Sequence, residues 1–552
     1  MKTTLFLKMK KGLLFITAIV LSTLSFTAFA QNYTIELVKN INPSGDSNPI
    51  YFSAYNGKLY FSANDGTNGK ELWVTDGTTD GTQLFKDINP SGDSNPVHFS
   101  AYNGKLYFSA KDDIYGKELW VTDGTTAGTQ ILKDINSGSD NSSPARFTPH
   151  NGKLYFFTVD GIHGREPWVT DGTTAGTQLV KDINSGSEGS FYTGFAQYNG
   201  KLFFGANDGV HGAELWVTDG TTEGTQMVKD INPGIEGSTI GNFIPYNGKL
   251  YFRANNGEKG VELWVTDGTT AGTFMLIDIN PGSGNSHPNP FIPYNGKLFF
   301  PAINSINGRE LWATDGTAEG TEMVKDIRDG AASSGPVNLK DYNGKLYFTA
   351  DDGIHGDELW VTDGTTAGTL MLKDINSGSG GSQADRFTLC NGKLYFRADD
   401  GTNGFQLWET DGTEAGTRML TPAIYSYSSP LDGMVGDNAF TEFNGSLYFK
   451  AQYSTSIGYE LYKLTTDAPS GIEELESTEI SIYPNPTNGK ITISAKEIIK
   501  QVAVYNVVGK TVFQAPINNQ QSEIDLSNQT KGVYFVNVVT EKGSFSKKIV
   551  VE

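Results

Sequence analysis

Histidine recurs at one turn position and is the first residue type in this chain that could do chemistry. His163, His211 and His355 each occur in the pattern Asp-Gly-x-His-Gly. An imidazole titrates near neutral pH and binds transition metals, so one hypothesis is a pH- or metal-responsive rim. The same position in other copies of this text holds unrelated residues: Asn68, Tyr115, Lys259, Asn307 and Asn403. We therefore interpret it as a variable, exposed turn.

Acidic and amide side chains gather in a second recurring loop. Residues 87–95 alternate oxygen-bearing side chains around Gly92, as calcium-binding loops do. Related loops contain Asp134, Asn136 and Asp140, or Asp182, Asn184 and Glu188, whereas residues 278–284 keep only the first acid. Asp and Asn also form Asx turns in Gly-rich loops without any metal. Calcium is therefore an alternative hypothesis, and we assign no metal-ligating residue.

The sequence carries no catalytic signature that we recognise. It lacks a HExxH motif, a phosphate-binding GxxxxGK[ST] loop, a strand-to-helix GxSxG turn and any zinc-type spacing of Cys and His. We therefore predict no catalytic or cofactor-binding residue and expect a protein that is not an enzyme. The single cysteine, Cys390, stands where sister copies have Tyr or another bulky residue, which predicts a buried, unreactive thiol.

Two places depart from repetition and are where a unique site would be sought. The connection 421–438 is longer than its sisters and carries Tyr425, Tyr427, Asp432 and Asp437. Arg328 replaces the Asn that usually follows Asp-Ile. Unique loops on a symmetric scaffold often bind ligands. We favour the interpretation that these departures are irregular loop sequence where the repeats end, without a binding role.

The elements that must position these residues follow from the tryptophan spacing. All eight Trp occur at one interval of 47 residues and then six of 48: Trp73, Trp120, Trp168, Trp216, Trp264, Trp312, Trp360 and Trp408. A period near 48 residues suits a four-stranded propeller blade. A Trp at the same internal strand position in every copy predicts a packing residue between blades, and a ligand-stacking platform is the alternative.

The first copy shows how four strands arise. Residues 50–55 (IYFSAY) and 58–63 (KLYFSA) alternate around Asn56-Gly57, a dipeptide that favours a type I′ hairpin. Residues 70–75 (KELWVT) and 82–88 (TQLFKDI) supply the third and fourth strands. Because both faces of these strands carry apolar or aromatic bulk, we expect each sheet to pack between two neighbours.

Counting the hairpins gives a ring size. Nine inner hairpins carry Asn-Gly, at Asn56, Asn103, Asn151, Asn199, Asn247, Asn295, Asn343, Asn391 and Asn444. The ninth copy lacks a fourth strand, whereas residues 34–46 repeat the text of one. The sequence therefore predicts an all-β propeller of nine four-stranded blades, closed by the N-terminal strand. An eight-bladed ring with a degenerate extra unit, or an open spiral, is the alternative.

The repeated octapeptide Glu-Leu-Trp-Val-Thr-Asp-Gly-Thr marks a family. It occurs at 71–78, 118–125, 214–221, 262–269 and 358–365, with recognisable variants in the other copies. It resembles the ELWxxDGT repeat family of secreted bacterial proteins over about residues 34–465. The resemblance implies a propeller-like architecture and brings no assigned chemistry.

The N-terminus reads as a leader. Lys2, Lys8, Lys10 and Lys11 precede an apolar run at 13–24, which stops at Ala28-Phe29-Ala30. This order is typical of a secretory signal peptide, and a retained membrane anchor is the alternative. No later segment is apolar for about 18 residues, so we expect no stable membrane span after signal removal.

The C-terminus has its own text. Strand-like stretches from Ile480 onward alternate around Gly and Asn turns, which predicts a small Ig-like β-sandwich. Residues 483–486 (YPNP), 504–510 (VYNVVGK) and 532–536 (GVYFV) resemble the C-terminal sorting domain of type IX secretion cargo. That resemblance implies recognition by the type IX secretion machinery through residues 480–552. It also implies release from the cell or attachment to its outer surface.

Composition excludes some functions and sharpens the domain plan. The net charge is −20, and residues 31–471 carry 30 basic and 53 acidic side chains, so we expect no nucleic-acid partner. The predicted parts are a signal peptide (1–30), a repeat propeller (31–465), a linker (466–479) and a sorting domain (480–552). We predict an extracellular, non-enzymatic binding protein for glycan, protein or surface polymer. A polysaccharide-acting hydrolase or lyase and a structural surface-layer component are the alternatives.

Overall fold

The computed structural model describes residues 33–421, 429–432, 439–466, 480–506, 511–540 and 544–552. They belong to two compact units, one ending at Ala468 and one beginning at Pro469. Strands and turns make up the described residues, with no helix among them. None of the described segments is therefore a helix able to cross a membrane. The predicted signal peptide at 1–30 lies outside the described residues.

Nine antiparallel sheets of four strands form the first unit, and we number them by their order along the chain. Sheets 1 to 3 are β2 (Ile50–Tyr55), β3 (Lys58–Asn64), β4 (Lys70–Thr75), β5 (Gln83–Lys86); β6 (Val97–Tyr102), β7 (Lys105–Asp112), β8 (Gly116–Thr122), β9 (Gln130–Lys133); and β10 (Ala145–His150), β11 (Lys153–Val159), β12 (Arg165–Thr170), β13 (Gln178–Leu179). Sheets 4 to 6 are β14 (Ala196–Tyr198), β15 (Lys201–Asn207), β16 (Ala213–Thr218), β17 (Gln226–Lys229); β18 (Gly241–Tyr246), β19 (Lys249–Asn255), β20 (Val261–Thr266), β21 (Phe274–Ile277); and β22 (Ile292–Tyr294), β23 (Lys297–Asn304), β24 (Gly308–Thr314), β25 (Glu322–Lys325). Sheets 7 to 9 are β26 (Val337–Tyr342), β27 (Lys345–Asp351), β28 (Asp357–Thr362), β29 (Leu370–Lys373); β30 (Asp385–Cys390), β31 (Lys393–Asp399), β32 (Phe405–Thr410), β33 (Arg418–Leu420); and β34 (Phe440–Phe443), β35 (Ser446–Ala451), β36 (Glu460–Thr466) with β1 (Tyr33–Lys39).

The inner hairpins have the geometry that their Asn-Gly text predicts. Asn56 and Gly57 have φ angles of 49° and 70°, and both angles are positive, as a type I′ turn requires. Each hairpin joins the first and second strands of a sheet, so its turn fixes their register. The fourth strand of sheet 1 is shorter than the sequence predicts, at four residues from Gln83 to Lys86.

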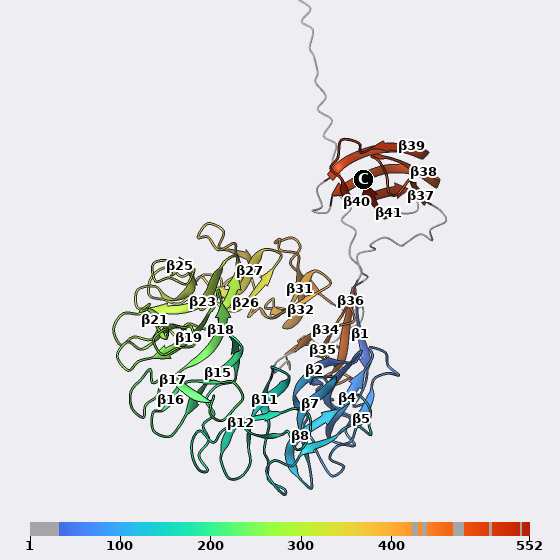
Figure 1. Cartoon of the computed structure of the whole chain (residues 1–552). Coiled ribbons are helices and arrows are strands. Elements are labelled where there is room, and N and C mark those ends of the chain that lie inside the picture. The colour runs from blue at the N-terminus through green and yellow to red at the C-terminus, as the bar shows by residue number, and fades with distance from the viewer. Residues whose placement is uncertain (1–32, 422–428, 433–438, 467–479, 507–510, 541–543) are drawn as a thin grey trace, which may run out of the picture. The chain divides into compact units, whose positions relative to one another are not determined.

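The ninth sheet combines the two ends of the repeat segment. Strand β1 pairs antiparallel with β36, with Tyr33 opposite Thr466 and Leu37 opposite Tyr462 (Figure 1). Lys39 of β1 donates from Nζ to the carbonyl of Thr82 in sheet 1 at 2.7 Å. Lys86 makes the same bond from sheet 1 to Thr129 of sheet 2, also at 2.7 Å. Strand β1 therefore takes the place of a fourth strand, as the sequence predicts.

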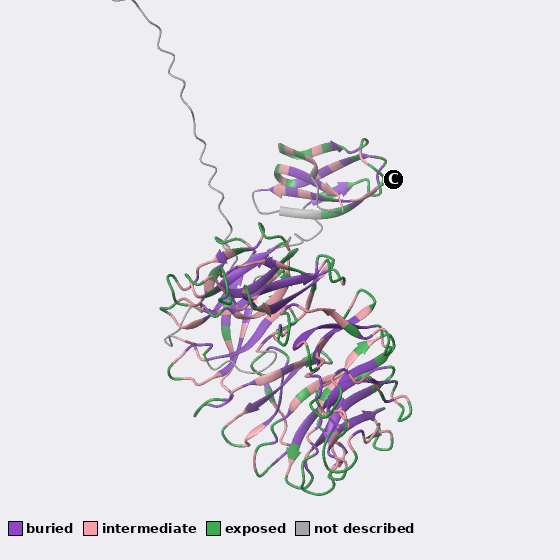
Figure 2. Cartoon of the chain, turned by 90° about the vertical axis from the view of Figure 1, so that its left-hand side faces the viewer, coloured by how far each residue is buried: buried purple, intermediate pink, exposed green. Residues whose placement is uncertain are grey.

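Each of sheets 1 to 8 buries its tryptophan against the sheet before it. Trp120 packs with Tyr60 and Leu72 of sheet 1, and Trp73 packs with Tyr448 and Leu461 of sheet 9. All eight Trp side chains are only 5–9% exposed, so they are packing residues. Figure 2 shows buried residues along the strands and exposed residues along the connecting loops.

The first strands of consecutive sheets lie closest to the centre of this unit. Neighbouring first strands contact one another, as β2 contacts β6, β6 contacts β10, and β30 contacts β34. Fourth strands such as β17, β21 and β25 lie on the periphery (Figure 1). Residues at either end of a first strand are therefore brought together around the centre.

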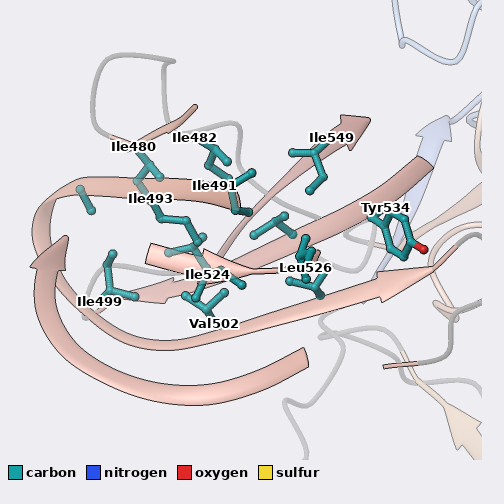
Figure 3. Packing of buried hydrophobic residues seen from close by; sticks show 14 of the residues in the cluster. Ile480, Ile482, Ile491, Ile493, Ile499, Val502, Ile524, Leu526, Tyr534 and Ile549 are labelled. Atoms are coloured by element: carbon teal, nitrogen blue, oxygen red, sulfur yellow. The ribbon is translucent and has the colours of Figure 1, made fainter. Parts of the chain in front are cut away.

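The C-terminal unit is a five-stranded sheet around its own core. It contains β37 (Ile480–Tyr483), β38 (Lys490–Asn506), β39 (Thr511–Asp525), β40 (Gly532–Thr540) and β41 (Ser544–Val551). The two long strands β38 and β39 pair along their length with register shifts near Ile499. Ile480, Ile493, Val502 and Tyr534 pack in one cluster inside the curved strands (Figure 3). From the sequence, 490–494 (KITIS) and 501–510 (QVAVYNVVGK) are expected to be separate strands, whereas residues 490–506 form one strand and 507–510 lie outside the described residues.

Candidate functional site

The most repeated motif of the chain is a structural turn. In the first copy, the backbone and hydroxyl of Thr78 donate to Oδ1 of Asp76 at 2.9 and 2.7 Å. Gly77 has a φ of 97° and donates its N–H to the hydroxyl of Thr75 at 2.9 Å. The same bonds recur in the later copies, for example around Asp123 and Asp171. The Asp-Gly-Thr text therefore builds the turn between the third and fourth strands.

A fully buried glutamate in eight of the nine sheets organises the loop that leads to the next sheet. Oε2 of Glu71 accepts from the backbone N–H of Ile88 at 2.7 Å and from the hydroxyl of Ser94 at 2.6 Å. Oε1 accepts from the backbone N–H of Ser94 at 2.8 Å. Burial raises the pKa of Glu71 to about 7, and these donors oppose the rise. In sheet 8 the position is Gln406.

The recurrent histidines complete a turn. Nδ1 of His163 lies 2.7 Å from Oδ2 of Asp160, and this hydrogen bond raises the pKa of the imidazole. Asn68 does the same work in sheet 1, because its Nδ2 donates to Oδ2 of Asp65 at 2.7 Å. Since an amide replaces the imidazole without changing the bond, a titrating group is not needed there. Where Tyr115 occupies the position, its backbone N–H donates to Oδ1 of Asp112 at 2.6 Å. Among the described residues, no three His, Cys, Asp or Glu side chains gather as a metal would require.

Oxygen atoms of the Asp-rich loops accept hydrogen bonds from within the protein. Oδ1 of Asp93 accepts the backbone N–H of Lys70 at 2.7 Å, and the amide of Asn89 donates to the carbonyl of Asp93 at 3.3 Å. Oδ1 of Asp87 is buried without a hydrogen-bond partner among the described residues. Calcium at these loops stays a prediction.

The other residues singled out from the sequence do not form a site together. Nη1 of Arg328 lies 2.5 Å from Oδ2 of Asp351, so its charge is paired. Cys390 is 3% exposed, and burial followed by the charge of Glu442 raises its thiol pKa to about 11. Tyr425, Tyr427 and Asp437 of the long connection lie outside the described residues.

The clearest differences between copies of the repeat lie where the first strands begin. Three positions of each copy vary there while the text around them hardly changes. The first precedes the aromatic residue of the first strand, the second is the fifth residue of the KLYFxA strand, and the third precedes Glu-Leu-Trp. Backbone pairing joins the first two, because the residue before the first position lies opposite the second, as Ile50 lies opposite Ser62. The third lies opposite a residue two positions beyond the second, as Lys70 lies opposite Asn64. We call these positions the variable mouth.

Most arginines of the chain stand in the variable mouth. Six of the eight occupy it, together with three lysines, against one carboxylate, that of Asp357: Arg146, Arg165, Arg253, Arg309, Arg386, Arg397, Lys70, Lys117 and Lys450. The rest of the unit is strongly acidic, so this concentration of positive charge is local. It creates a surface that attracts anions.

One group of variable-mouth residues lies where sheets 5 and 6 meet. Burial lowers the pKa of His287, and the nearby charges of Arg253 and Arg309 lower it further. Arg309 donates to the carbonyls of His287 at 3.4 Å and Asn289 at 2.6 Å. Nε of Arg253 and Nδ2 of Asn242 are buried without a hydrogen-bond partner among the described residues. Arg253 and Asn242 thus have unused donors here, and Arg309 of the next sheet brings a second guanidinium group close to His287.

A second cationic contact lies between sheets 9 and 1. Lys450 is 6% exposed, and its Nζ donates to Oδ1 of Asn48 at 3.3 Å. Burial and then the charge of Lys70 lower the pKa of Lys450 to about 8. Cations from the last and first sheets therefore also meet at the mouth.

The opposite end of the first strands carries a tyrosine before Asn-Gly in six sheets, and sheets 3, 8 and 9 have His150, Cys390 and Phe443 instead. The hydroxyl of Tyr55 donates to the carbonyl of Gly104 in the next sheet at 2.6 Å, and Tyr198 repeats this bond to Gly248 at 2.7 Å. In sheet 3 the tyrosine is replaced by His150, whose Nε2 lies 3.1 Å from the carbonyl of Gly200. A hollow of about 460 Å³ opens there, lined by Tyr102, His150, Asn151, Gln197, Tyr198 and their neighbours.

The sequence analysis overlooked the variable mouth and His150. Both could have been found from the sequence, because each shows substitutions at positions of an otherwise constant repeat. Neither stands out along the chain, since the three mouth positions come from different strands. Only the register of the strands brings them together.

Residues 481–552 match the family described as the secretion system C-terminal sorting domain. The C-terminal unit is a type IX sorting domain, and it implies interaction with the secretion machinery. The protein is accordingly exported by a Gram-negative bacterium and is either secreted or attached to the outer cell surface.

Two curated proteins match short stretches of the chain. An endo-acting ulvan lyase of Formosa agariphila is 26% identical over 125 residues, which are 22% of this chain and 24% of that protein. Beta-agarase A of Zobellia galactanivorans is 32% identical over 80 residues, 14% of each chain. The chain thus spans less than a quarter of either relative.

Solved structures match the chain only weakly. PorZ, a surface component of the type IX secretion system of Porphyromonas gingivalis, matches with a TM-score of 0.25 and 12% identity, covering 92% of this chain and 82% of PorZ. The β-propeller domain of the Trilobed protease from Pyrococcus furiosus matches with a TM-score of 0.30 and 11% identity, covering 59% of this chain and 99% of that domain. Similarity at this level carries no information about activity. The class of the first unit, an all-β propeller, rests on its own sheets and their packing.

Proposed function

We propose that the nine sheets are the blades of one closed propeller of the ELWxxDGT repeat type, and that this propeller is a non-enzymatic binding module. Its ligand would be a glycan, a protein or a surface polymer outside the cell. The observation that carries the proposal is the concentration of sequence variation at one mouth of a repeated scaffold. A scaffold kept uniform for packing, with variation confined to one surface, is the arrangement of a recognition protein.

The proposal includes no cofactor. Calcium would act only as a structural ion in the Asp-rich loops of residues 87–95 and their equivalents. A melting temperature that rises with calcium and falls with a chelator would add calcium to the proposal. An unchanged melt would remove it.

A binding screen tests the module directly. The full secreted protein would be presented to neutral and acidic polysaccharides and to outer-surface proteins, with and without calcium. We expect saturable binding to at least one class. Failure to bind any of them would contradict the proposal and favour a purely structural role in a surface layer.

The short similarities to an ulvan lyase and an agarase favour one alternative, a polysaccharide-acting enzyme. Such an enzyme needs an acid and a base that converge on one bond. Release of new reducing ends or of unsaturated products from any polysaccharide, lost on changing one mouth residue, would replace the binding proposal with this alternative.

A further inference from the structure

Unpaired positive charge is the most unusual property of the variable mouth. Among the described residues, neither Arg146, Arg253 nor Arg309 has a carboxylate within 4 Å. Arg253 and Arg309 lie close enough to share an effect on His287. Like charges held together repel each other, and a bound anion relieves the repulsion. The arrangement therefore favours an anionic ligand.

Sheet 8 shows what an arginine at this position does when a carboxylate is present. Arg397 occupies the position of Arg253, the fifth residue of the second strand. Its Nε and Nη2 donate to the two carboxylate oxygens of Asp385 at 2.8 and 2.7 Å, a bidentate pair. Asp385 lies directly opposite Arg397 in the register of β30 and β31.

Sheet 5 has the same arginine without that carboxylate. Gly241 lies opposite Arg253 in the register of β18 and β19, so a glycine takes the place of Asp385. A Cβ atom on Gly241 would lie 3.8 Å from Nε of Arg253 and 3.7 Å from Thr193, at ordinary contact distances. Sheet 5 therefore lacks the carboxylate that pairs with this arginine in sheet 8, and Nε of Arg253 is left without a hydrogen-bond partner among the described residues.

We propose that Arg253, with Arg309 and Asn242, binds a carboxylate or sulfate group of an extracellular acidic polysaccharide. A planar guanidinium donates two parallel hydrogen bonds to such a group, and Asn242 adds an amide donor. This inference rests on the proposed binding function and names its ligand class.

A polymer fits the mouth better than a single small anion. The cationic positions extend over several sheets, from Arg146 and Arg165 in sheet 3 to Lys450 in sheet 9. A chain with regularly spaced acidic groups engages several of these cations at once, so weak individual contacts reinforce one another. Free small anions engage one position only.

Two reciprocal substitutions test the site without removing an arginine. Gly241→Asp supplies the carboxylate that sheet 8 has, and we expect it to pair with Arg253 and exclude the ligand. Asp385→Gly removes that carboxylate from Arg397 and opens the equivalent place in sheet 8. Lys201→Ala removes one exposed positive charge at the opposite end of the first strands and is the matched control. Circular dichroism and melting curves establish that each variant is folded.

Binding of the full secreted protein would be measured by calorimetry against four probes. Polygalacturonate carries carboxylates, dextran sulfate carries sulfates, dextran is neutral, and free galacturonate is a monomeric carboxylate. We expect binding to at least one acidic polymer that weakens with added salt, because exposed ion pairs are screened. Gly241→Asp should weaken it at least tenfold, Asp385→Gly should preserve or strengthen it, and Lys201→Ala should change it less than twofold.

The outcomes separate the inference from the function on which it rests. Unchanged affinity in a folded Gly241→Asp variant would overturn the inference while the propeller remained a binding module. Binding of dextran alone would do the same. Equal affinity for polygalacturonate and free galacturonate would overturn the polymeric ligand. Binding to none of the probes and to no surface protein would overturn both proposals.

Discussion

The two ends of the first strands differ in how much their residues vary from one copy of the repeat to the next. At the hairpin end, Asn-Gly turns, Asp-Gly-Thr turns and tyrosine hydroxyls that reach the next sheet recur with few exceptions. At the variable mouth, residues such as Ser62, Gly205 and Arg253 occupy one equivalent position. Both ends belong to the same strands and border the same hydrophobic clusters between neighbouring sheets. One end holds neighbouring sheets together, and the other is free to acquire recognition residues.

The largest test of this contrast substitutes a glycine at the hairpin end. Gly77→Ala should lower the free energy of unfolding by about 2–4 kcal/mol, because φ is positive there and the new methyl group meets the hydroxyl of Tyr448. Urea unfolding measures the change. Arg146→Ala at the variable mouth is the comparison variant and should stay within about 0.5 kcal/mol of the parent. Equal losses at the two ends would contradict the contrast.

A second test concerns the buried glutamate that follows the third position of the variable mouth. Burial raises the pKa of Glu118 to about 7, above its usual value of 4.5, so the folded state binds the proton more tightly. This contribution to stability is complete below pH 4.5 and is lost as the pH rises through 7. Glu118→Gln removes the titration and imitates Gln406 of sheet 8.

The stability difference between parent and Glu118→Gln is the quantity to follow. It should shift in favour of the variant by about 1–3 kcal/mol between pH 4.5 and pH 8. Thermal or urea unfolding at several pH values measures it. A difference that does not change with pH would show that the four hydrogen-bond donors hold the carboxylate ionised throughout.

The replacement of tyrosine by His150 at the hairpin end of sheet 3 permits a smaller test. His150→Tyr restores the residue of six sister copies and should place a hydroxyl near the carbonyl of Gly200. We expect a change within about 1 kcal/mol, the usual net value of one hydrogen bond. Loss of stability beyond about 2 kcal/mol would show that His150 and Gln197 form an arrangement that the tyrosine cannot replace.

The smallest expected effect is at the histidine turns. His211→Asn keeps a donor to Asp208, as Asn68 does for Asp65 in sheet 1. We expect no measurable change in melting temperature at pH 8 and no response to added zinc in parent or variant. A zinc-dependent rise in the parent alone would restore the hypothesis of a metal-responsive rim.

The sequence predicted local features well because short segments encode them. Asn56-Gly57 can adopt the two positive φ angles of its turn, and residues 34–46 repeat the text of a fourth strand, so hairpins and β1 were both predictable. The recurrent Trp positions predicted their own burial, since both faces of each strand carry apolar bulk. These features depend on neighbours along the chain.

Features that depend on pairing between distant residues were not predictable in the same way. That Gly241 lies opposite Arg253, or that Arg309 of the next sheet approaches the same histidine, follows only from register and ring geometry. The single strand β38 was read as two, because the polar stretch around Lys496 and Glu497 looks like a turn. Strand β38 continues through this stretch, although its pairing with β39 steps from Ser494 directly to Ile499.

The pairing of Tyr33 with Thr466 has a consequence for how the protein matures. The closing strand is made first and its partner last, so the ninth sheet cannot form until all repeats have been synthesised. Only Gln31 and Asn32 separate the predicted signal cleavage point from β1. Cleavage a few residues late would remove part of the strand that completes the sheet. Cleavage after Ala30, as the sequence predicts, would leave β1 whole and able to complete the ninth sheet.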